Sequence, residues 1–203
     1  MISTPYDHIA DSFRELRTTL HPKEEEYLSL LVENTPPGSL ILDLGCGTGQ
    51  PIAAHLAERG FDIVGVDGSA AMLEMARTAL PEYRWIHERI ESVEFEERFE
   101  AIICWDALFH LPRHEHEAVI CKMYRWLLPT GRMMVSSGGI VTGSEGFTDT
   151  MFGHDFYYDS LPPEEMVAAI QRAGFDIVLA EMCNLPDGGR DKGKWATLAE
   201  KRH

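Results

Sequence analysis

A glycine-rich turn carries the strongest chemical signal in the 203-residue sequence. The turn, Leu42–Gly49, reads LDLGCGTG and follows an apolar run that predicts a buried strand. Its three glycines let the backbone bend tightly and approach a ligand more closely than a Cβ atom would allow. Asp67 stands eighteen residues beyond Gly49, at the end of the next predicted strand. A carboxylate in that position can accept hydrogen bonds from both hydroxyls of a ribose.

The spacing within the turn indicates which nucleoside it would bind. A dinucleotide site has G-x-G-x-x-G, with backbone amides and a helix N-terminus around the pyrophosphate. Here the spacing is G-x-G-x-G, and Asp43 stands two residues before the first glycine. A carboxylate so close to the turn would repel a pyrophosphate but would help to hold an ammonium group beside a sulfonium. S-adenosylmethionine has these charges, whereas NAD does not.

The elements that must position these residues alternate along the chain. Short apolar runs predict strands at residues 39–44, 61–66, 83–86, 101–105 and 132–136. Amphipathic segments predict helices at residues 51–59, 70–76 and 114–127, the first with proline in its first helical position. This alternation predicts an α/β fold with a parallel sheet covered by helices on both faces.

The two ends of the chain depart from this alternation. An amphipathic helix at residues 23–34 predicts an N-terminal helical cap over about residues 5–34. Residues 138–161 form a connection rich in glycine and aromatic residues, longer than compact domains usually keep without a function. A helix that begins at Pro162-Pro163 precedes two predicted strands, at residues 175–182 and 194–199, joined as an antiparallel hairpin.

Composition and charge limit the class of protein. The length favours one domain spanning residues 1–203. No apolar run is long enough to span a membrane, no secretory signal begins the chain, and four cysteines without CxxC pairing suit a reducing cytoplasm. The net charge of −15 disfavours nucleic acid and anionic lipid as partners. We therefore expect a cytoplasmic monomer or homodimer that acts on a small molecule.

Several motifs together resemble the class I S-adenosylmethionine-dependent methyltransferases. The resemblance runs from about Tyr6 to Glu200, and within that superfamily the chain resembles small bacterial enzymes grouped loosely with the ubiquinone/menaquinone-biosynthesis type. The matching segments are Tyr6–Ala10, Leu42–Gly49, Val64–Leu73, Phe99–Leu111 and Leu127–Arg132. The resemblance implies a doubly wound, Rossmann-like, mostly parallel sheet of seven strands that ends in an antiparallel hairpin. It also implies methyl transfer by in-line displacement.

The resemblance also implies the residues that hold the cofactor. The glycine turn would face the methionine part with Asp43 near its amino group, Asp67 would bind the ribose, and Met72 would pack on the adenine. Arginine stands where an aspartate often meets the adenine amino group, so either Glu88 replaces it or the backbone of Ile90 makes the contact. The expected cofactor-binding residues are Tyr6, Asp43, Gly45, Cys46, Gly47, Gly49, Asp67, Gly68, Met72, Arg89, Ile90 and Cys104.

The end of the fourth predicted strand would lie beside the transferable methyl group, because ligands sit at the carboxyl ends of such strands. Asp106 and His110 are therefore the candidates for orienting or deprotonating an acceptor. The alternative is that Asp106 caps the following turn and His110 is a packed loop residue. His110, His114 and His116 lack an acidic or cysteine partner at ligand spacing, so we expect no metal site.

The aromatic connection at residues 138–161 is expected to cover something, since so much exposed aromatic surface would aggregate. One hypothesis makes it a lid on the acceptor pocket, with Trp105, Tyr157 and Tyr158 binding the substrate; the alternative is a dimer contact or core cover. The predicted activity is methyl transfer to a small organic acceptor. The alternatives are an inactive S-adenosylmethionine-binding homologue and, less favoured by the charge, a tRNA methyltransferase.

Overall fold

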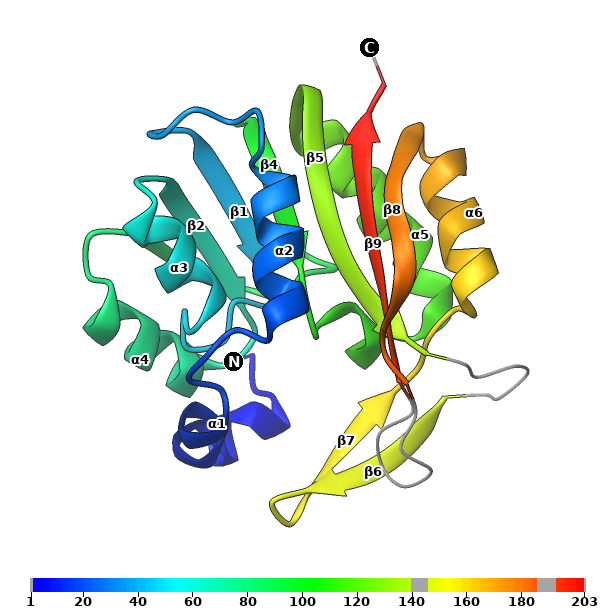
Figure 1. The fold of residues 1–203 in the computed structure, drawn as a ribbon. Coiled ribbons are helices and arrows are strands. Elements are labelled where there is room, and N and C mark those ends of the chain that lie inside the picture. Colours follow the sequence, from blue (N-terminus) through cyan, green and yellow to red (C-terminus); the bar gives the residue numbers. More distant parts are fainter. Residues whose placement is uncertain (1, 140–145, 186–192, 203) are drawn as a thin grey trace.

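The protein forms a three-layer α/β sandwich in the computed structural model, which describes residues 2–139, 146–185 and 193–202 (Figure 1). Its central sheet has seven strands in the order β3-β2-β1-β4-β5-β9-β8. The strands are β1 (Leu40–Leu44), β2 (Asp62–Asp67), β3 (Arg84–His87), β4 (Phe99–Cys104), β5 (Leu127–Gly138), β8 (Phe175–Asn184) and β9 (Lys194–Lys201). Strands β1 to β5 pair in parallel, whereas β9 runs antiparallel to both β5 and β8. The seven-stranded, mostly parallel sheet with an antiparallel end is thus confirmed.

Helices cover both faces of the sheet because successive strand residues point to opposite sides. In β1, Leu42 and Leu44 pack in one core cluster with α5 (Arg113–Trp126) and α6 (Pro163–Arg172). Ile41 packs in the other core cluster, together with residues of three further helices. These are α2 (Pro22–Leu31), α3 (Ile52–Glu58) and α4 (Ala70–Ala79). The parallel strands β1, β2 and β4 are therefore buried on both sides, and their polar side chains lie near the strand ends.

The N-terminal cap is longer than one helix. It contains the 3-10 helix η1 (Pro5–His8) and α1 (Ala10–Leu16) ahead of α2, and Figure 1 shows η1 and α1 lying at the carboxyl ends of β1 and β2. Asp7 fixes this segment to the first turn of α4, where its carboxylate accepts hydrogen bonds from Ser69 Oγ at 2.7 Å and the Ala71 amide at 3.2 Å. The segment therefore closes over the end of the sheet.

Three local features differ from the sequence-based predictions. Pro51 is the N-cap of α3 rather than its first residue. β5 begins at Leu127, five residues before the predicted strand, and contains a bulge. Phe99 pairs with Leu127 but Ala101 pairs with Arg132, so β5 holds extra residues between these pairs, of which Pro129 and Thr130 are exposed. Residues 138–161 contain an unpredicted two-stranded sheet, β6 (Phe147–Met151) with β7 (His154–Tyr158).

The β6–β7 hairpin extends beyond the carboxyl ends of the strands, below the sheet in Figure 1. Phe152 and Gly153 both have positive φ, 52° and 80°, as the tight two-residue turn of a hairpin requires. β8 and β9 pair as the predicted antiparallel hairpin, and residues 186–192 of the loop between them lie outside the described residues. Among the residues that are described, no helix is long and apolar enough to cross a membrane.

Candidate functional site

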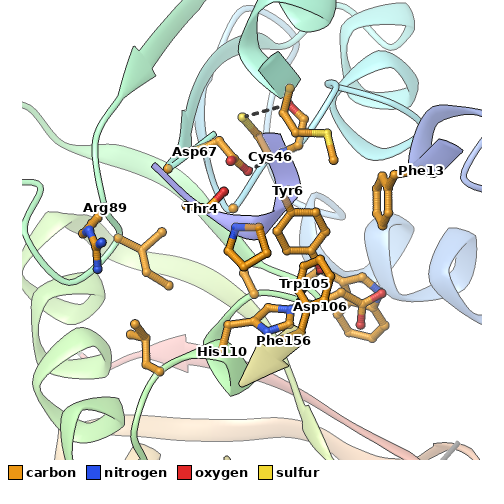
Figure 2. A pocket seen from close by; sticks show the side chains of 18 of the residues that line it. Thr4, Tyr6, Phe13, Cys46, Asp67, Arg89, Trp105, Asp106, His110 and Phe156 are labelled. Carbon is orange, nitrogen blue, oxygen red and sulfur yellow. Dashed lines mark hydrogen bonds between the residues drawn. The ribbon is translucent and has the colours of Figure 1, made fainter. Parts of the chain in front are cut away.

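A cavity of about 520 Å³ opens at the carboxyl ends of β1, β2 and β4. The N-terminal segment and the β6–β7 hairpin supply its remaining walls, and Figure 2 shows Tyr6 at its centre with Trp105, Asp106, His110 and Phe156 around it. Most of the residues proposed from the sequence line this cavity. They are Tyr6, Asp43, Gly45, Cys46, Gly47, Asp67, Gly68, Met72, Arg89, Ile90, Trp105, Asp106, His110 and Tyr157.

Three proposed residues do not line the cavity. Gly49 closes the glycine turn, where its amide donates to the Cys46 carbonyl at 3.0 Å. Cys104 is fully buried in the core, and burial raises the pKa of its thiol to about 12. Tyr158 stacks on Phe147 at 5.5 Å, beside rather than inside the cavity. These three residues therefore lie behind or beside the walls of the cavity instead of facing it.

The glycine turn is built by backbone hydrogen bonds to the neighbouring strand. The amides of Gly45 and Cys46 both donate to the Val66 carbonyl, at 2.8 and 3.1 Å. Gly45 has φ of 77° and Gly47 has φ of 54°, conformations that side-chain-bearing residues rarely adopt. Burial raises the pKa of the Cys46 thiol well above its usual value, so this residue acts as a small backbone spacer rather than a nucleophile.

Asp67 is fixed at the end of β2 by two amides. Its carboxylate oxygens accept hydrogen bonds from Gly47 and Ser69, each at 2.8 Å. Burial raises its pKa even though these two amides favour the ionised form. A carboxylate held this rigidly beside the cavity can accept further hydrogen bonds from a pair of vicinal hydroxyls.

Asp43 is a buried acid at the base of the cavity, only 4% exposed. No residue that the structure describes donates a hydrogen bond to its carboxylate. Burial, and then the charge of Asp67, raise its pKa to about 7, while the Arg17 cation acts in the opposite direction. A buried acid with so few partners is suited to receive a cation from a ligand.

Arg17 and Glu24 form an ion pair at the cavity wall, with Glu24 buried and Arg17 half-buried. The guanidinium of Arg17 donates to both Glu24 oxygens, at 2.7 and 2.8 Å, and one of these oxygens also accepts from the Trp105 indole at 2.8 Å. Arg17 itself lines the cavity. No sequence pattern marks Arg17, because it lies in the loop between α1 and α2, where residue spacing carries no motif.

Asp106 and Lys194 meet at the edge of the cavity. The Lys194 ammonium lies 2.7 and 2.8 Å from the two carboxylate oxygens and 5.3 Å from the centre of the Trp105 ring. Ser136 Oγ accepts the Asp106 amide hydrogen at 2.7 Å. Asp106 therefore does not cap the following turn: its carboxylate pairs with a lysine from β9.

His110 connects the two segments that close the cavity. Tyr6 Oη, from η1, lies 2.9 Å from Nε2, and the Tyr157 carbonyl, from β7, lies 2.9 Å from Nδ1. Tyr6 also packs against Phe13 and Phe156, with ring centres 5.5 and 4.9 Å apart. Phe13 and Phe156 were not proposed from the sequence, although Phe156 belongs to the aromatic run expected to cover a pocket.

The far end of the cavity is formed by Met72, Arg89 and Ile90, with Glu91 beside them. Met72 and Ile90 are buried, whereas Arg89 points away from Tyr6 and His110 in Figure 2. Glu88 does not line the cavity, and its carboxylate accepts the Arg89 amide at 2.9 Å instead. The buried apolar side chains of Met72 and Ile90 are therefore suited to hold a flat ring at this end. Among the described residues, no cluster of three or more potential metal ligands is found.

The raised pKa of Asp43 makes binding of a cationic ligand depend on pH. Only the ionised acid can pair with an ammonium, so affinity for S-adenosylmethionine should rise with pH through about 7. We expect roughly twentyfold tighter binding at pH 7.5 than at pH 5.5, measured by calorimetry. The Asp43→Asn variant should bind the ligand weakly and should lose most of the pH dependence of the affinity. If its affinity depended on pH as in the wild type, Asp43 would not be the group that pairs with the ammonium.

The same raised pKa has the opposite effect on stability. The native state holds the Asp43 proton more tightly than the unfolded state, so the unliganded protein should lose stability as pH rises from about 4 to about 7, which thermal melting across this range measures.

Comparison with known proteins gives a consistent result. A methyltransferase domain family matches residues 41–131. The putative methyltransferase YqeM of Bacillus subtilis is 29% identical over 72% of this chain and 61% of its own length. The ubiquinone biosynthesis O-methyltransferase of Pseudomonas fluorescens is 26% identical over 69% of this chain and 66% of its own length. The chain thus spans slightly less than two thirds of these relatives.

A solved structure shows the same fold over most of the chain. The S-adenosylmethionine-dependent methyltransferase structure from Methanosarcina mazei superposes with a TM-score of 0.73 at 20% identity, covering 90% of this chain and 98% of that one.

Proposed function

We propose that the chain transfers a methyl group to a small organic acceptor, on the premise that it belongs to the class I S-adenosylmethionine-dependent methyltransferases. The observation that carries this proposal is the pair of acids at the glycine turn. The Asp67 carboxylate lines the cavity and is held in place by two amide hydrogen bonds. Asp43 also lines the cavity, is buried and has a raised pKa. A neutral or anionic nucleotide would leave this concentration of negative charge uncompensated.

The residues present fit the cofactor along its whole length. Asp67 would accept the ribose hydroxyls, and the ring would lie between Met72 and Ile90 at the apolar end. At the other end Asp43 would take the ammonium, and Arg17, already beside it, would take the carboxylate. When bound, the cofactor supplies a methyl group made electrophilic by its sulfonium.

The remaining space favours a small acceptor. Trp105, Phe156 and Tyr157 line the cavity. Figure 2 shows Tyr6 beside Trp105 and Phe156. In this proposal residues 1–203 act as one methyltransferase domain in the cytoplasm, with residues 5–34 and the described part of residues 138–161 closing over both ligands. In-line attack then depends on alignment, which closed walls provide.

Calorimetric titration tests the cofactor assignment. S-adenosylmethionine and S-adenosylhomocysteine should bind with micromolar or tighter affinity, and NAD should not bind. Asp67→Asn should weaken binding by about 100-fold, since it removes a charge-assisted pair of hydrogen bonds. Binding of NAD, or no binding of either adenosyl ligand, would refute the assignment.

A second measurement separates an enzyme from an inactive homologue that only binds the cofactor. Release of S-adenosylhomocysteine should accelerate when a small-molecule fraction of a bacterial extract is added. An unchanged background rate with extract, alongside normal cofactor binding, would support the inactive homologue.

A further inference from the structure

Both ring nitrogens of His110 are occupied by protein groups, and this fixes its tautomer. A carbonyl oxygen can only accept a hydrogen bond, so Nδ1, 2.9 Å from the Tyr157 carbonyl, carries the ring proton. In the neutral ring Nε2 is then an acceptor, and Tyr6, 2.9 Å away, donates its hydroxyl proton to it. His110 therefore cannot contact an acceptor directly while this hydrogen bond is formed.

Burial keeps the imidazole neutral. It lowers the pKa of His110, while the Tyr157 carbonyl and the Asp106 carboxylate act in the opposite direction. The rings of Tyr6, Phe109, Phe156 and Tyr158 surround the imidazole, with centres 4.8 to 6.1 Å away. The basic lone pair of His110 is thus kept unprotonated and directed at Tyr6.

Tyr6 is placed between this base and the cavity. Its ring lines the cavity and packs edge-on against Phe13 and Phe156. The preceding residues are anchored, because Asp7 accepts the Thr4 amide at 2.9 Å as well as the hydroxyl of Ser69. The phenol oxygen is therefore held in one position, with His110 on one side and the ligand space on the other.

We propose that Tyr6 is the catalytic residue that deprotonates a hydroxyl acceptor, and that His110 is the positioning residue that receives the proton of Tyr6. The inference rests on the proposed function. As the acceptor oxygen forms its bond to the methyl carbon, its proton moves to Tyr6 Oη and the Tyr6 proton moves to His110 Nε2. The carbon–sulfur bonding pair stays on sulfur. One positive charge disappears at the sulfonium and one appears at the imidazolium, so the net charge of the closed site is conserved.

Two features favour a hydroxyl as the attacking group. A phenol passes a proton most readily to or from another oxygen of similar acidity, and removal of a proton is needed because a neutral hydroxyl is a weak nucleophile. The other candidate base, Asp106, already pairs with Lys194 through both carboxylate oxygens. The route through Tyr6 therefore leaves that ion pair intact.

Substituted phenols, benzyl alcohol, aniline and thiophenol serve as probes of the acceptor. Wild-type enzyme should methylate the hydroxyl probes preferentially. Tyr6→Phe and His110→Gln should each lower kcat on phenol by about 100-fold or more, with cofactor affinity changed less than about threefold. The loss should nearly vanish for nitrophenols that are already ionised at the assay pH. Tyr83→Phe and His114→Gln, which lie outside the cavity, are the matched controls.

Equal losses on ionised and un-ionised phenols would overturn the relay, as would preferential methylation of aniline or thiophenol. If the cofactor binds but no probe is methylated, that result would count against the proposed function. The proton relay would then be tested by a spectroscopic measurement that needs no turnover. Nitrogen-15 spectra of the unliganded protein should show that His110 is protonated at Nδ1 and unprotonated at Nε2. The Nε2 signal should be shifted in the Tyr6→Phe variant relative to the wild type. The opposite tautomer, or an unshifted Nε2 signal, would overturn it.

Discussion

Replacing Gly45 with alanine is expected to weaken cofactor binding by at least about 100-fold and to destabilise the protein by roughly 3 kcal/mol. Two costs add at this position. The backbone has φ of 77°, which alanine adopts only with strain, and a Cβ built there would overlap the Cβ of Ala107. Ala107 follows the Trp105-Asp106 corner, so relief of the overlap must move either the glycine turn or that corner. Both line the cavity.

Gly38→Ala is the matched control for this prediction. Gly38 has φ of 84°, but nothing lies within 4 Å of a Cβ built there. It should therefore cost only the backbone strain, about 1 kcal/mol, and leave cofactor affinity unchanged. Thermal melting should show a decrease of about 9 °C for Gly45→Ala and about 3 °C for Gly38→Ala. Equal shifts in the two variants, with normal calorimetric affinity in both, would show that the turn tolerates a Cβ.

The sequence predicts the sheet well because each parallel strand is an apolar run between clear turns. Strand pairing then follows from the alternation with helices, and the glycine turn and Asp67 are brought together because the carboxyl ends of neighbouring parallel strands share one edge. Asp43 and Asp67 could therefore be assigned to one cavity from their positions relative to the strands alone.

Contacts between distant segments could not be predicted in the same way. Lys194 reaches Asp106 from β9, and Arg17 reaches Trp105 through Glu24, across separations that no periodicity encodes. The β6–β7 hairpin was missed because Phe152 occupies a left-handed position without being glycine or asparagine, so only Gly153 marked its turn. The sequence predicted Tyr6 only as a cofactor-binding residue. Its hydrogen bond with His110 could not be predicted, because the two residues lie 104 positions apart.

Replacing Glu24 with alanine should strongly destabilise the protein. Glu24 is 2% exposed, and its two oxygens accept four hydrogen bonds: two from Arg17, one from the Trp105 indole and one from the His21 amide. Its removal leaves the partly buried Arg17 cation and a buried indole N–H without this acceptor. We expect a loss of about 3 kcal/mol, or roughly 9 °C in melting temperature.

Glu25→Ala, on the exposed side of the same helix turn, is the matched control and should change stability by less than about 0.5 kcal/mol. The Arg17→Gln, Glu24→Gln double variant should recover part of the loss seen for Glu24→Gln alone, because no uncompensated charge stays buried.

The pH dependence gives an independent check on Glu24. Burial alone would raise its pKa, but the hydrogen bonds from Arg17 and the His21 amide lower it below its usual value. The folded protein therefore favours the ionised form, and the stabilisation is present at neutral pH and lost as pH falls through the acidic range. Wild type and Glu24→Gln should converge in melting temperature at low pH. A constant difference between them down to the acid limit would show that Glu24 contributes packing rather than charge, and Arg17 would then owe its place in the cavity wall to some other contact.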